Sequence, residues 1–226
     1  TNYKVTLEVE DGWLKITPKE VTIKVSGKTL ETEYTGSEQS ITGYDISGKP
    51  DGVDVTLKSG VTAEAKGTDV DTYLMGLTKE SFNVVGTNYK VTLEVEDGWM
   101  KITPVEAEVT ITANAAEYTY DGTEKGGNGA KATGLLEGHR LESATVSGSQ
   151  VNAGIYVDEL VVSGAKIVDA TGKDVTSNYA NINYESGTLT INKQQAIITV
   201  FNTSKNYGDE DPQFKHMVVG LVKEDD

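Results

Sequence analysis

Apolar and polar residues alternate along most of this chain with a period of two. Residues 3–10 read Tyr-Lys-Val-Thr-Leu-Glu-Val-Glu, a pattern that places one side of a β-strand on a core and the other in water. The same reading predicts strands at Val21–Val25, Val53–Leu57, Val109–Ile111, Ala144–Val146, Ile155–Val162 and Ile197–Val200. No segment of ten or more residues has apolar positions at helical spacing with caps at both ends. The pattern therefore predicts an all-β fold.

A turn signal follows the first alternating run. Glu10–Gly12 ends in glycine, which is free to adopt a positive φ, and Leu14 and Ile16 then continue the apolar side. Trp13 and Lys15 fall on the other side. This order predicts a β-hairpin that closes a small β-sheet domain.

The same segment occurs twice. Thr1–Pro18 returns as Thr87–Pro104 with Leu14 replaced by Met100 as the single change, an offset of 86 residues. That spacing is typical of one small domain, whereas solenoid units span about 20 to 50 residues. A diverged copy of the ending occupies 178–191. The repeat therefore predicts a tandem array of independently folded modules.

The array predicts four segments. Residues 1–18 are expected to be the C-terminal hairpin of a truncated upstream module, 19–104 the first complete module, 105–193 the second, and 194–226 the N-terminal part of a truncated third. Short antiparallel strands with turns every 8 to 12 residues or so favour immunoglobulin-like β-sandwiches. Pro18 and Pro104 lie at module boundaries, either as short connectors or as strand ends, so the modules are expected to run end to end.

Composition narrows the possible partners. The formal net charge is −15, and the chain has no cysteine, which excludes disulfides and thiolate metal sites. The twenty basic residues are scattered among 35 acidic ones, so nucleic acid is not expected as a partner. No run of about 18 apolar residues occurs, and we expect no direct membrane insertion of this segment.

Catalytic constellations are not evident. His139 and His216 are the two histidines, belong to different predicted modules, and have no second member for a triad or a zinc site. Both are therefore expected to be exposed to solvent. Gly126–Gly129 lacks the lysine and hydroxyl residue of a phosphate-binding loop and is expected to be a flexible loop. The sequence predicts no enzyme and no catalytic, cofactor-binding or metal-binding residue.

Several groups of carboxylates raise the question of calcium. None has a recognised loop spacing, and calcium needs six or more oxygen ligands, so we interpret them as solvated acidic turns. The groups are Asp51 with Asp54, Asp69 with Asp71, and Asp209 with Glu210 and Asp211.

Aromatic residues offer two further interpretations. Tyr120–Gly122 predicts a turn in which the aspartate caps an amide, the glycine has positive φ and the tyrosine packs over the module end; a sugar-stacking tyrosine is the alternative. Trp13 and Trp99 point away from the apolar side of their strands. They are either surface ring platforms or contacts to an adjoining module, and we favour the contacts.

Short phrases in the second predicted module carry a family resemblance. Tyr120–Thr123, Gly134-Leu135 with Gly138-His139, and Asn152–Tyr156 resemble the YDG/MBG-type immunoglobulin-like repeats of bacterial surface proteins. The last segment adds Tyr207–Pro212 and Gly220-Leu221, which resemble a YGD variant of the same repeats. The first module departs from the pattern, with Tyr34–Ser37 and Asp69–Tyr73 in the corresponding places.

The resemblance implies large secreted or wall-attached bacterial proteins whose stalks are strings of such domains, and no catalytic residue. Some bacterial stalk domains form Lys–Asn isopeptide bonds, for which Lys24 and Asn192 lie on terminal strands, although no module shows both partners. We therefore expect a stalk or spacer that projects a distal domain. The alternatives are an adhesion module for a host or microbial glycan or protein, and an accessory module of a secreted polysaccharide-active enzyme.

Overall fold

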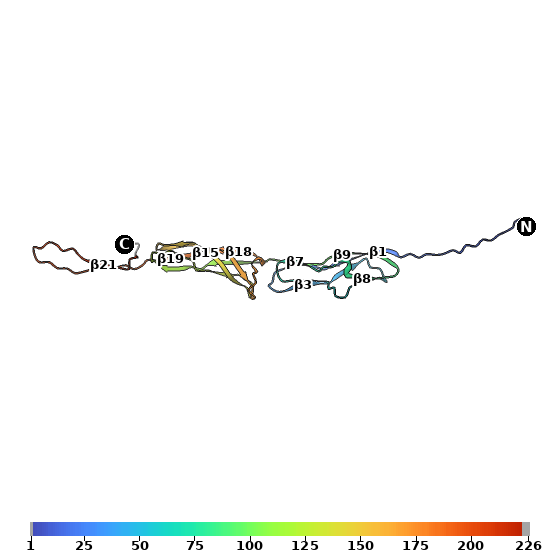
Figure 1. Ribbon diagram of the computed structural model, residues 1–226, viewed down its shortest axis with the longest axis horizontal. Coiled ribbons are helices and arrows are strands. Elements are labelled where there is room, and N and C mark those ends of the chain that lie inside the picture. The colour runs from blue at the N-terminus through green and yellow to red at the C-terminus, as the bar shows by residue number, and fades with distance from the viewer. Residues whose placement is uncertain (1, 223–226) are drawn as a thin grey trace. The chain divides into compact units, whose positions relative to one another are not determined.

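The computed structural model describes residues 2–222 and is built almost entirely of β-strands (Figure 1). Two single-turn 3₁₀ helices occur, and the described residues contain no α-helix. The chain forms two compact units: one holds the chain up to Thr32 together with Ser37–Ile102, and the other holds Glu33–Gly36 together with the chain from Thr103 onward. The predicted all-β fold is confirmed.

The first unit contains ten short strands and one 3₁₀ helix at Lys79–Ser81. The strands are β1 (Lys19–Gly27), β2 (Thr29–Glu33), β3 (Gln39–Thr42), β4 (Tyr44–Ser47), β5 (Asp54–Leu57), β6 (Glu64–Gly67), β7 (Asp71–Leu74), β8 (Phe82–Val85), β9 (Tyr89–Glu96) and β10 (Trp99–Thr103).

Two three-stranded sheets organise this unit, in the orders β4-β1-β9 and β2-β10-β7, with the pairs β3-β6 and β5-β8 beside them. β1 runs parallel to β9, with Val25 opposite Val95, and antiparallel to β4. Alternate residues of β1 enter the core, where Ile23 and Val25 pack with Val53 and Phe82. The period-two pattern of β1 is thus produced by burial of one side of the strand.

The second unit repeats the first three-stranded sheet of this arrangement, and its strands range from two to fifteen residues in length. They are β11 (Val105–Ala113), β12 (Ala116–Thr119), β13 (Lys125–Gly126), β14 (Ala130–Thr133), β15 (Arg140–Ser147), β16 (Ser149–Gln150), β17 (Gly154–Val168), β18 (Tyr179–Glu185), β19 (Gly187–Asn192), β20 (Ile197–Val200) and β21 (His216–Val219). A 3₁₀ helix spans Thr176–Asn178.

Its sheets have the orders β14-β11-β18 and β12-β19-β17-β15, with the pairs β13-β16 and β20-β21. β11 is parallel to β18, and β12 is parallel to β19. Ile111, Leu160, Ile167 and Leu189 are fully buried in its core. The six strands predicted from alternation are all present in the two units, although most extend further than the pattern indicated.

The predicted closing hairpin is wrong. β9 pairs with β1, whereas β10 lies in the other three-stranded sheet between β2 and β7, so the two strands are not hydrogen-bonded to each other. Gly98, which ends the segment between them, does not have a positive φ. The chain crosses from one sheet to the other at this glycine, and it does the same between β18 and β19 before Gly187.

A glycine recurs every 86 residues in the structure as well as in the sequence. Gly48, Gly134 and Gly220 have φ values of 75°, 83° and 88°, and each follows a strand that pairs antiparallel with the first strand of its module. A Cβ at these positions would lie 2.8, 2.1 and 2.2 Å from the backbone oxygens of Thr22, Glu108 and Gln195. Only glycine fits this contact and this φ, so the three sites share one local architecture.

Residues 2–18, called the N-terminal arm below, contain no strand, although they carry the sequence of β9 and β10. Their apolar side chains are exposed: Tyr3, Val5, Leu7, Val9, Leu14 and Ile16. The four predicted segments therefore stay a prediction, whereas the division at Ile102 and Thr103 separates the two compact units of the structure.

Candidate functional site: the histidine pocket of the second unit

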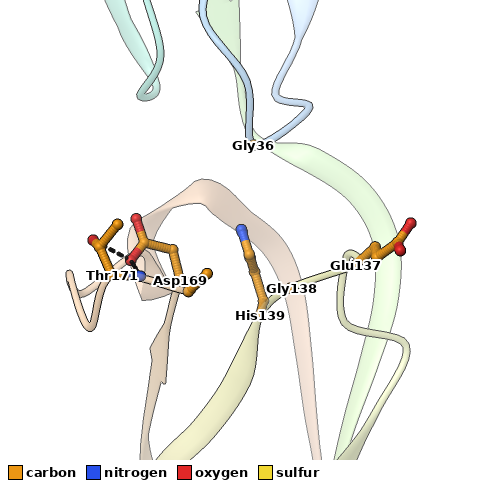
Figure 2. Close-up of a pocket in the computed structure, with 7 residues that line it drawn as sticks. Gly36, Glu137, Gly138, His139, Asp169 and Thr171 are labelled. Atoms are coloured by element: carbon orange, nitrogen blue, oxygen red, sulfur yellow. Dashed lines mark hydrogen bonds between the residues drawn. The ribbon is translucent and has the colours of Figure 1, made fainter.

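A shallow pocket of about 180 Å³ lies beside His139, just before β15 (Figure 2). Figure 2 shows the imidazole between Asp169 and Thr171 on one side and Glu137 on the other, with the Glu137 carboxylate pointing away from it. The full lining is Gly36, Glu137, Gly138, His139, Asp169, Ala170 and Thr171. The turn after β17 supplies the last three residues, and the segment Glu33–Gly36 of the same unit supplies Gly36.

His139 is held by two tyrosines. Its Nδ1 lies 2.6 Å from the Tyr179 hydroxyl, and the two rings meet edge to face with centroids 5.9 Å apart. The Tyr34 ring lies 5.9 Å from the imidazole on a tilted plane. The expectation that His139 is exposed is therefore wrong, because its ring is half-buried among aromatic neighbours. His216 is exposed on β21, as predicted.

The hydrogen bonds indicate how the protons are arranged. The Tyr179 hydroxyl accepts the Leu136 N–H at 3.2 Å, which leaves its own hydrogen for the bond to His139. In that arrangement Nδ1 is the acceptor, and a neutral imidazole carries its proton on Nε2. Burial raises the pKa of Tyr179, against a smaller lowering by the Leu136 amide, so the phenol stays neutral at physiological pH.

The Asp169 carboxylate accepts hydrogen bonds from residues of its own turn. Its Oδ1 accepts from the Thr171 amide at 2.8 Å, the Thr171 hydroxyl at 2.7 Å and the Lys173 amide at 3.0 Å. The Thr171 hydroxyl bond is the main reason that the pKa of Asp169 is lowered. Since this carboxylate stabilises a turn and Nδ1 of His139 faces a phenol, the pocket does not assemble an acid–histidine–nucleophile relay.

The pocket instead fixes a loop. Tyr34 is buried, and its backbone N–H donates to the carbonyl of Thr103 at 2.9 Å. The Glu106 N–H donates to the Glu33 side chain, so Glu33–Gly36 is tied to the first strand of the second unit. Sequence reasoning missed this cluster, because Tyr34, His139 and Tyr179 are far apart in the chain and none lies in a recognised spacing.

The Tyr120–Gly122 turn has the predicted geometry. Asp121 Oδ1 accepts from the Thr123 amide at 2.9 Å and hydroxyl at 2.6 Å, and Gly122 has φ 80°. Lys125 Nζ lies 2.6 Å from the other carboxylate oxygen. The lysine and the threonine hold the pKa of Asp121 well below its usual range. The ring of Tyr120 is half-buried beside Ala196 and Leu221.

A second tyrosine feature occurs in both units. The Tyr73 hydroxyl donates to the carbonyl of Asp69 at 3.0 Å, and the Tyr156 hydroxyl donates to the carbonyl of Asn152 at 2.9 Å. Each bond spans four residues and closes the corner where β7 or β17 begins. The phrases Asp69–Tyr73 and Asn152–Tyr156, which the sequence analysis aligned, therefore share a structural role.

The predicted acidic turns are present in part, because Asp51, Asp69 and Asp209 lie in turns or bends, whereas Asp54 and Asp71 begin the strands β5 and β7. Asp71 accepts from the Thr72 amide, Asp209 accepts from the Asn206 amide, and Asp211 pairs with Lys205. Within residues 2–222, no set of three or more histidine, cysteine, aspartate or glutamate side chains is placed to hold a metal ion.

Lys24 and Asn192 are each engaged elsewhere. Lys24 Nζ lies 2.7 Å from Glu96, and Asn192 Nδ2 donates to Glu117 at 2.7 Å. The two residues belong to different units, so they are not partners for an isopeptide bond within one unit. Trp99 is half-buried in β10, whereas Trp13 is exposed on the arm; contact of either ring with an adjoining module stays a prediction.

Gly126 departs from the predicted flexible loop, because it lies in β13 and pairs with Ser149 of β16. The remaining glycine-rich residues connect β13 to β14.

Neither models of known protein families nor curated proteins match this chain. Among the described residues, no helix is long and apolar enough to cross a membrane.

Proposed function

We propose that this chain is a structural repeat region, a stalk or spacer, of a large secreted or cell-surface bacterial protein. In this proposal its units are immunoglobulin-like β-sandwich modules of the YDG/MBG type, arranged end to end, and they project a distal functional domain. Their partners are neighbouring modules of the same chain.

The parallel pairing of the first and last long strands carries this proposal. β1 and β9 run in the same direction, as do β11 and β18, and each strand then continues toward the second sheet. The chain therefore enters a unit at one end of the sheet and leaves at the other. A module with this topology adds length when it is repeated, and the three glycines spaced 86 residues apart, Gly48, Gly134 and Gly220, support a repeated local fold.

Two further observations support a spacer over a ligand-binding domain. The histidine pocket of about 180 Å³ and a second pocket of about 240 Å³ beside Phe201 are smaller than the range of about 300 to 1,000 Å³ typical of small-molecule sites. In the histidine pocket, Nδ1 of His139, Oδ1 of Asp169 and the hydroxyl of Thr171 are also engaged in bonds within the unit. Each unit has two main sheets, and the chain crosses from a strand of one sheet to a strand of the other; this supports the sandwich interpretation.

The length added by one module tests the proposal. A chain with a second copy of residues 19–104 inserted after Pro104 is compared with the original chain by small-angle X-ray scattering. The fourteen residues of β1 and β2 set the length of a module, so we expect the maximum dimension to grow by roughly 45 Å. Growth by less than half of this would contradict the end-to-end arrangement.

A glycan and mucin binding screen separates the spacer from the adhesion and enzyme-accessory alternatives. We expect no saturable binding by the original chain. Saturable binding that is lost on Trp99→Ala or Tyr120→Ala, with Trp13→Ala as the control on the arm, would replace the spacer with an adhesion module. Binding restricted to one polysaccharide class would favour an accessory module.

A further inference from the structure

Four residues belong to one unit although the residues on both sides of them belong to the other. Glu33–Gly36 is part of the second unit, whereas the chain up to Thr32 and the chain Ser37–Ile102 form the first. The segment ends β2 and continues into the loop toward β3, and it is called the Tyr34 turn below. The second unit therefore includes a piece of chain that its own sequence, from Thr103 onward, does not supply.

Tyr34 is the buried residue of the turn. It is 3% exposed, and its ring centroid lies 5.9 Å from that of the His139 imidazole. His139 is held in turn by Tyr179, whose hydroxyl lies 2.6 Å from Nδ1. A buried aromatic ring removes a large apolar area from water, so it contributes strongly to the stability of the unit that surrounds it. The three rings form one cluster, and the Tyr34 turn supplies one of them.

Polar bonds hold the turn at the start of the second unit. The Tyr34 N–H donates to the Thr103 carbonyl at 2.9 Å, which continues the pairing of β2 with β10 and fixes the turn beside the first residue of the second unit. The Glu33 carboxylate then accepts the Glu106 N–H of β11. A hydrogen bond between a carboxylate and a main-chain N–H is one of the stronger kinds in proteins.

A glycine completes the fit of the turn. Gly36 has φ 79°, a conformation that other residues rarely adopt. A Cβ at this position would lie 3.3 Å from Nε2 of His139, and Figure 2 shows the imidazole pointing toward Gly36. The cluster therefore suits a tyrosine that is followed two positions later by glycine.

A second turn with this sequence pattern occurs 86 residues later. The Tyr120 N–H donates to the Asn192 carbonyl at 2.8 Å, which continues the pairing of β12 with β19, and Gly122 has φ 80°. A Cβ on Gly122 would lie 2.5 Å from Cγ1 of Val222, shortly after Gly220. The turn thus makes the same main-chain bond and approaches the segment after the next recurring glycine, as Gly36 approaches His139 after Gly134.

We propose that Glu106, His139 and Tyr179 of the second unit form a binding site for a Tyr-x-Gly turn, and that the loop between β2 and β3 supplies the occupant. Occupation of the site by Tyr34 sets the stability of the second unit from a position far outside its contiguous sequence. The site rests on the proposed function in treating the two units as neighbouring modules, and it names residues through which one module stabilises the next.

Hydrogen exchange of the full chain, read by mass spectrometry of peptic fragments, tests the occupant. Fragments from β11 and β18 report on the second unit, and fragments from β1 and β4 report on the first. We expect Tyr34→Ala to speed exchange of the slowest amides of the second unit roughly a hundredfold, the scale of truncating a buried aromatic residue. The first unit should exchange as in the native chain.

Tyr44→Ala is the matched control. Tyr44 packs edge to face on Phe82 in the core of the first unit, with ring centroids 5.2 Å apart. Its truncation should speed exchange in β1 and β4 and leave β11 and β18 unchanged, which is the reverse of the result expected for Tyr34→Ala.

A double variant tests the site. Because Tyr34→Ala and His139→Ala remove the same contact, we expect their combined effect on exchange to fall short of the product of the single effects by about fivefold or more. Full exchange of β11 and β18 in Tyr34→Ala, with β1 and β4 still protected, would support the proposal at its limit.

Acceleration by Tyr34→Ala that is confined to β1 and β4, or that is equal in both units, would overturn the proposal. A double variant whose effect equals the product would overturn the role of His139 in the site. The scattering test of the spacer can succeed or fail whatever the exchange shows, since the length that a module adds depends on the strand topology and not on Tyr34.

Discussion

Residues 2–17 and 88–103 have the same sequence except for Leu14 and Met100, yet the structure places them in opposite environments. Ile102 is 1% exposed and Met100 is fully buried, whereas Ile16 and Leu14 are 86% and 87% exposed. The second copy forms β9 and β10 because β1, β2 and β7 lie beside it. The first copy has no such partners among the described residues. An alternating pattern therefore specifies a strand only together with the strands that cover it.

This pair of segments provides a matched control for each substitution. In the background Trp13→Phe, the remaining tryptophan is Trp99 on β10, so its fluorescence during urea unfolding reports on the first unit. The four predictions below all use this measurement.

Truncation of Ile102 and of its counterpart Ile16 should give the largest difference in unfolding free energy between the two copies. Ile102→Ala leaves a cavity in the core and is expected to lower the free energy of unfolding of the first unit by about 2 to 5 kcal/mol. Ile16→Ala removes the same atoms from an exposed side chain and should have no measurable effect. Equal effects of the two would show that the arm is packed in solution.

The second largest loss of unfolding free energy is expected when a methyl group is added at Gly98, where the chain crosses between the sheets. A Cβ on Gly98 would lie 2.5 Å from the Met75 sulfur and 2.6 Å from the Lys28 carbonyl oxygen, while a Cβ on Gly12 would meet nothing within 4 Å. Gly98→Ala is therefore expected to cost about 1 to 3 kcal/mol through overpacking, and Gly12→Ala close to nothing. A neutral Gly98→Ala would contradict the close packing at the crossing.

The single natural difference between the copies, Met100 in place of Leu14, should have a smaller effect on the unfolding free energy. Met100→Leu makes the two segments identical and changes the shape of a buried side chain with little change in volume, so we expect a cost below about 1.5 kcal/mol. Leu14→Met on the arm is the control. A larger loss at position 100 would show that this core requires the flexible thioether.

Removal of the Glu96 charge on β9 should have the smallest effect on the stability of the first unit, and this effect should be confined to acidic pH. Bonds from Lys24, and then Ser26, lower the pKa of Glu96 in the folded unit. A carboxylate with a lowered pKa contributes stability above its unfolded pKa of about 4.3 and loses it as the pH falls through the folded value. Glu96→Gln should therefore reduce the dependence of stability on pH in the acid range, and Glu10→Gln should leave it unchanged. Identical pH profiles for Glu96→Gln and the background would contradict this.

The strands could be predicted from the sequence because burial of one side imposes a period of two on each strand separately. Val21, Ile23 and Val25 show this in β1 without any information on neighbouring strands. The turn at Gly12 and Gly98 could not be assigned in the same way. A glycine between two alternating runs suits a hairpin and a crossing between sheets alike, and only the distant strands β1 and β7 decide between them.

The tyrosine contacts also differ in whether the sequence could indicate them. The bond from Tyr156 to the carbonyl of Asn152 spans four residues within one aligned phrase, so the repeat itself carried a signal for it. The contact of His139 with Tyr179 joins residues 40 apart, and without the fold no spacing predicts it. Local features were thus accessible to sequence reasoning, whereas contacts set by the pairing of sheets were not.

The parallel register of β1 and β9 also determines how a unit resists mechanical force. Tension along the chain pulls Lys19 backwards and the residues after Glu96 forwards, so it loads the pairs from Lys19–Tyr89 to Ser26–Glu96 in shear. These bonds must break together, whereas an antiparallel hairpin pulled open from its free ends unzips one bond at a time. Each unit therefore presents its parallel hydrogen-bonded ladder lengthwise to a pull along the chain.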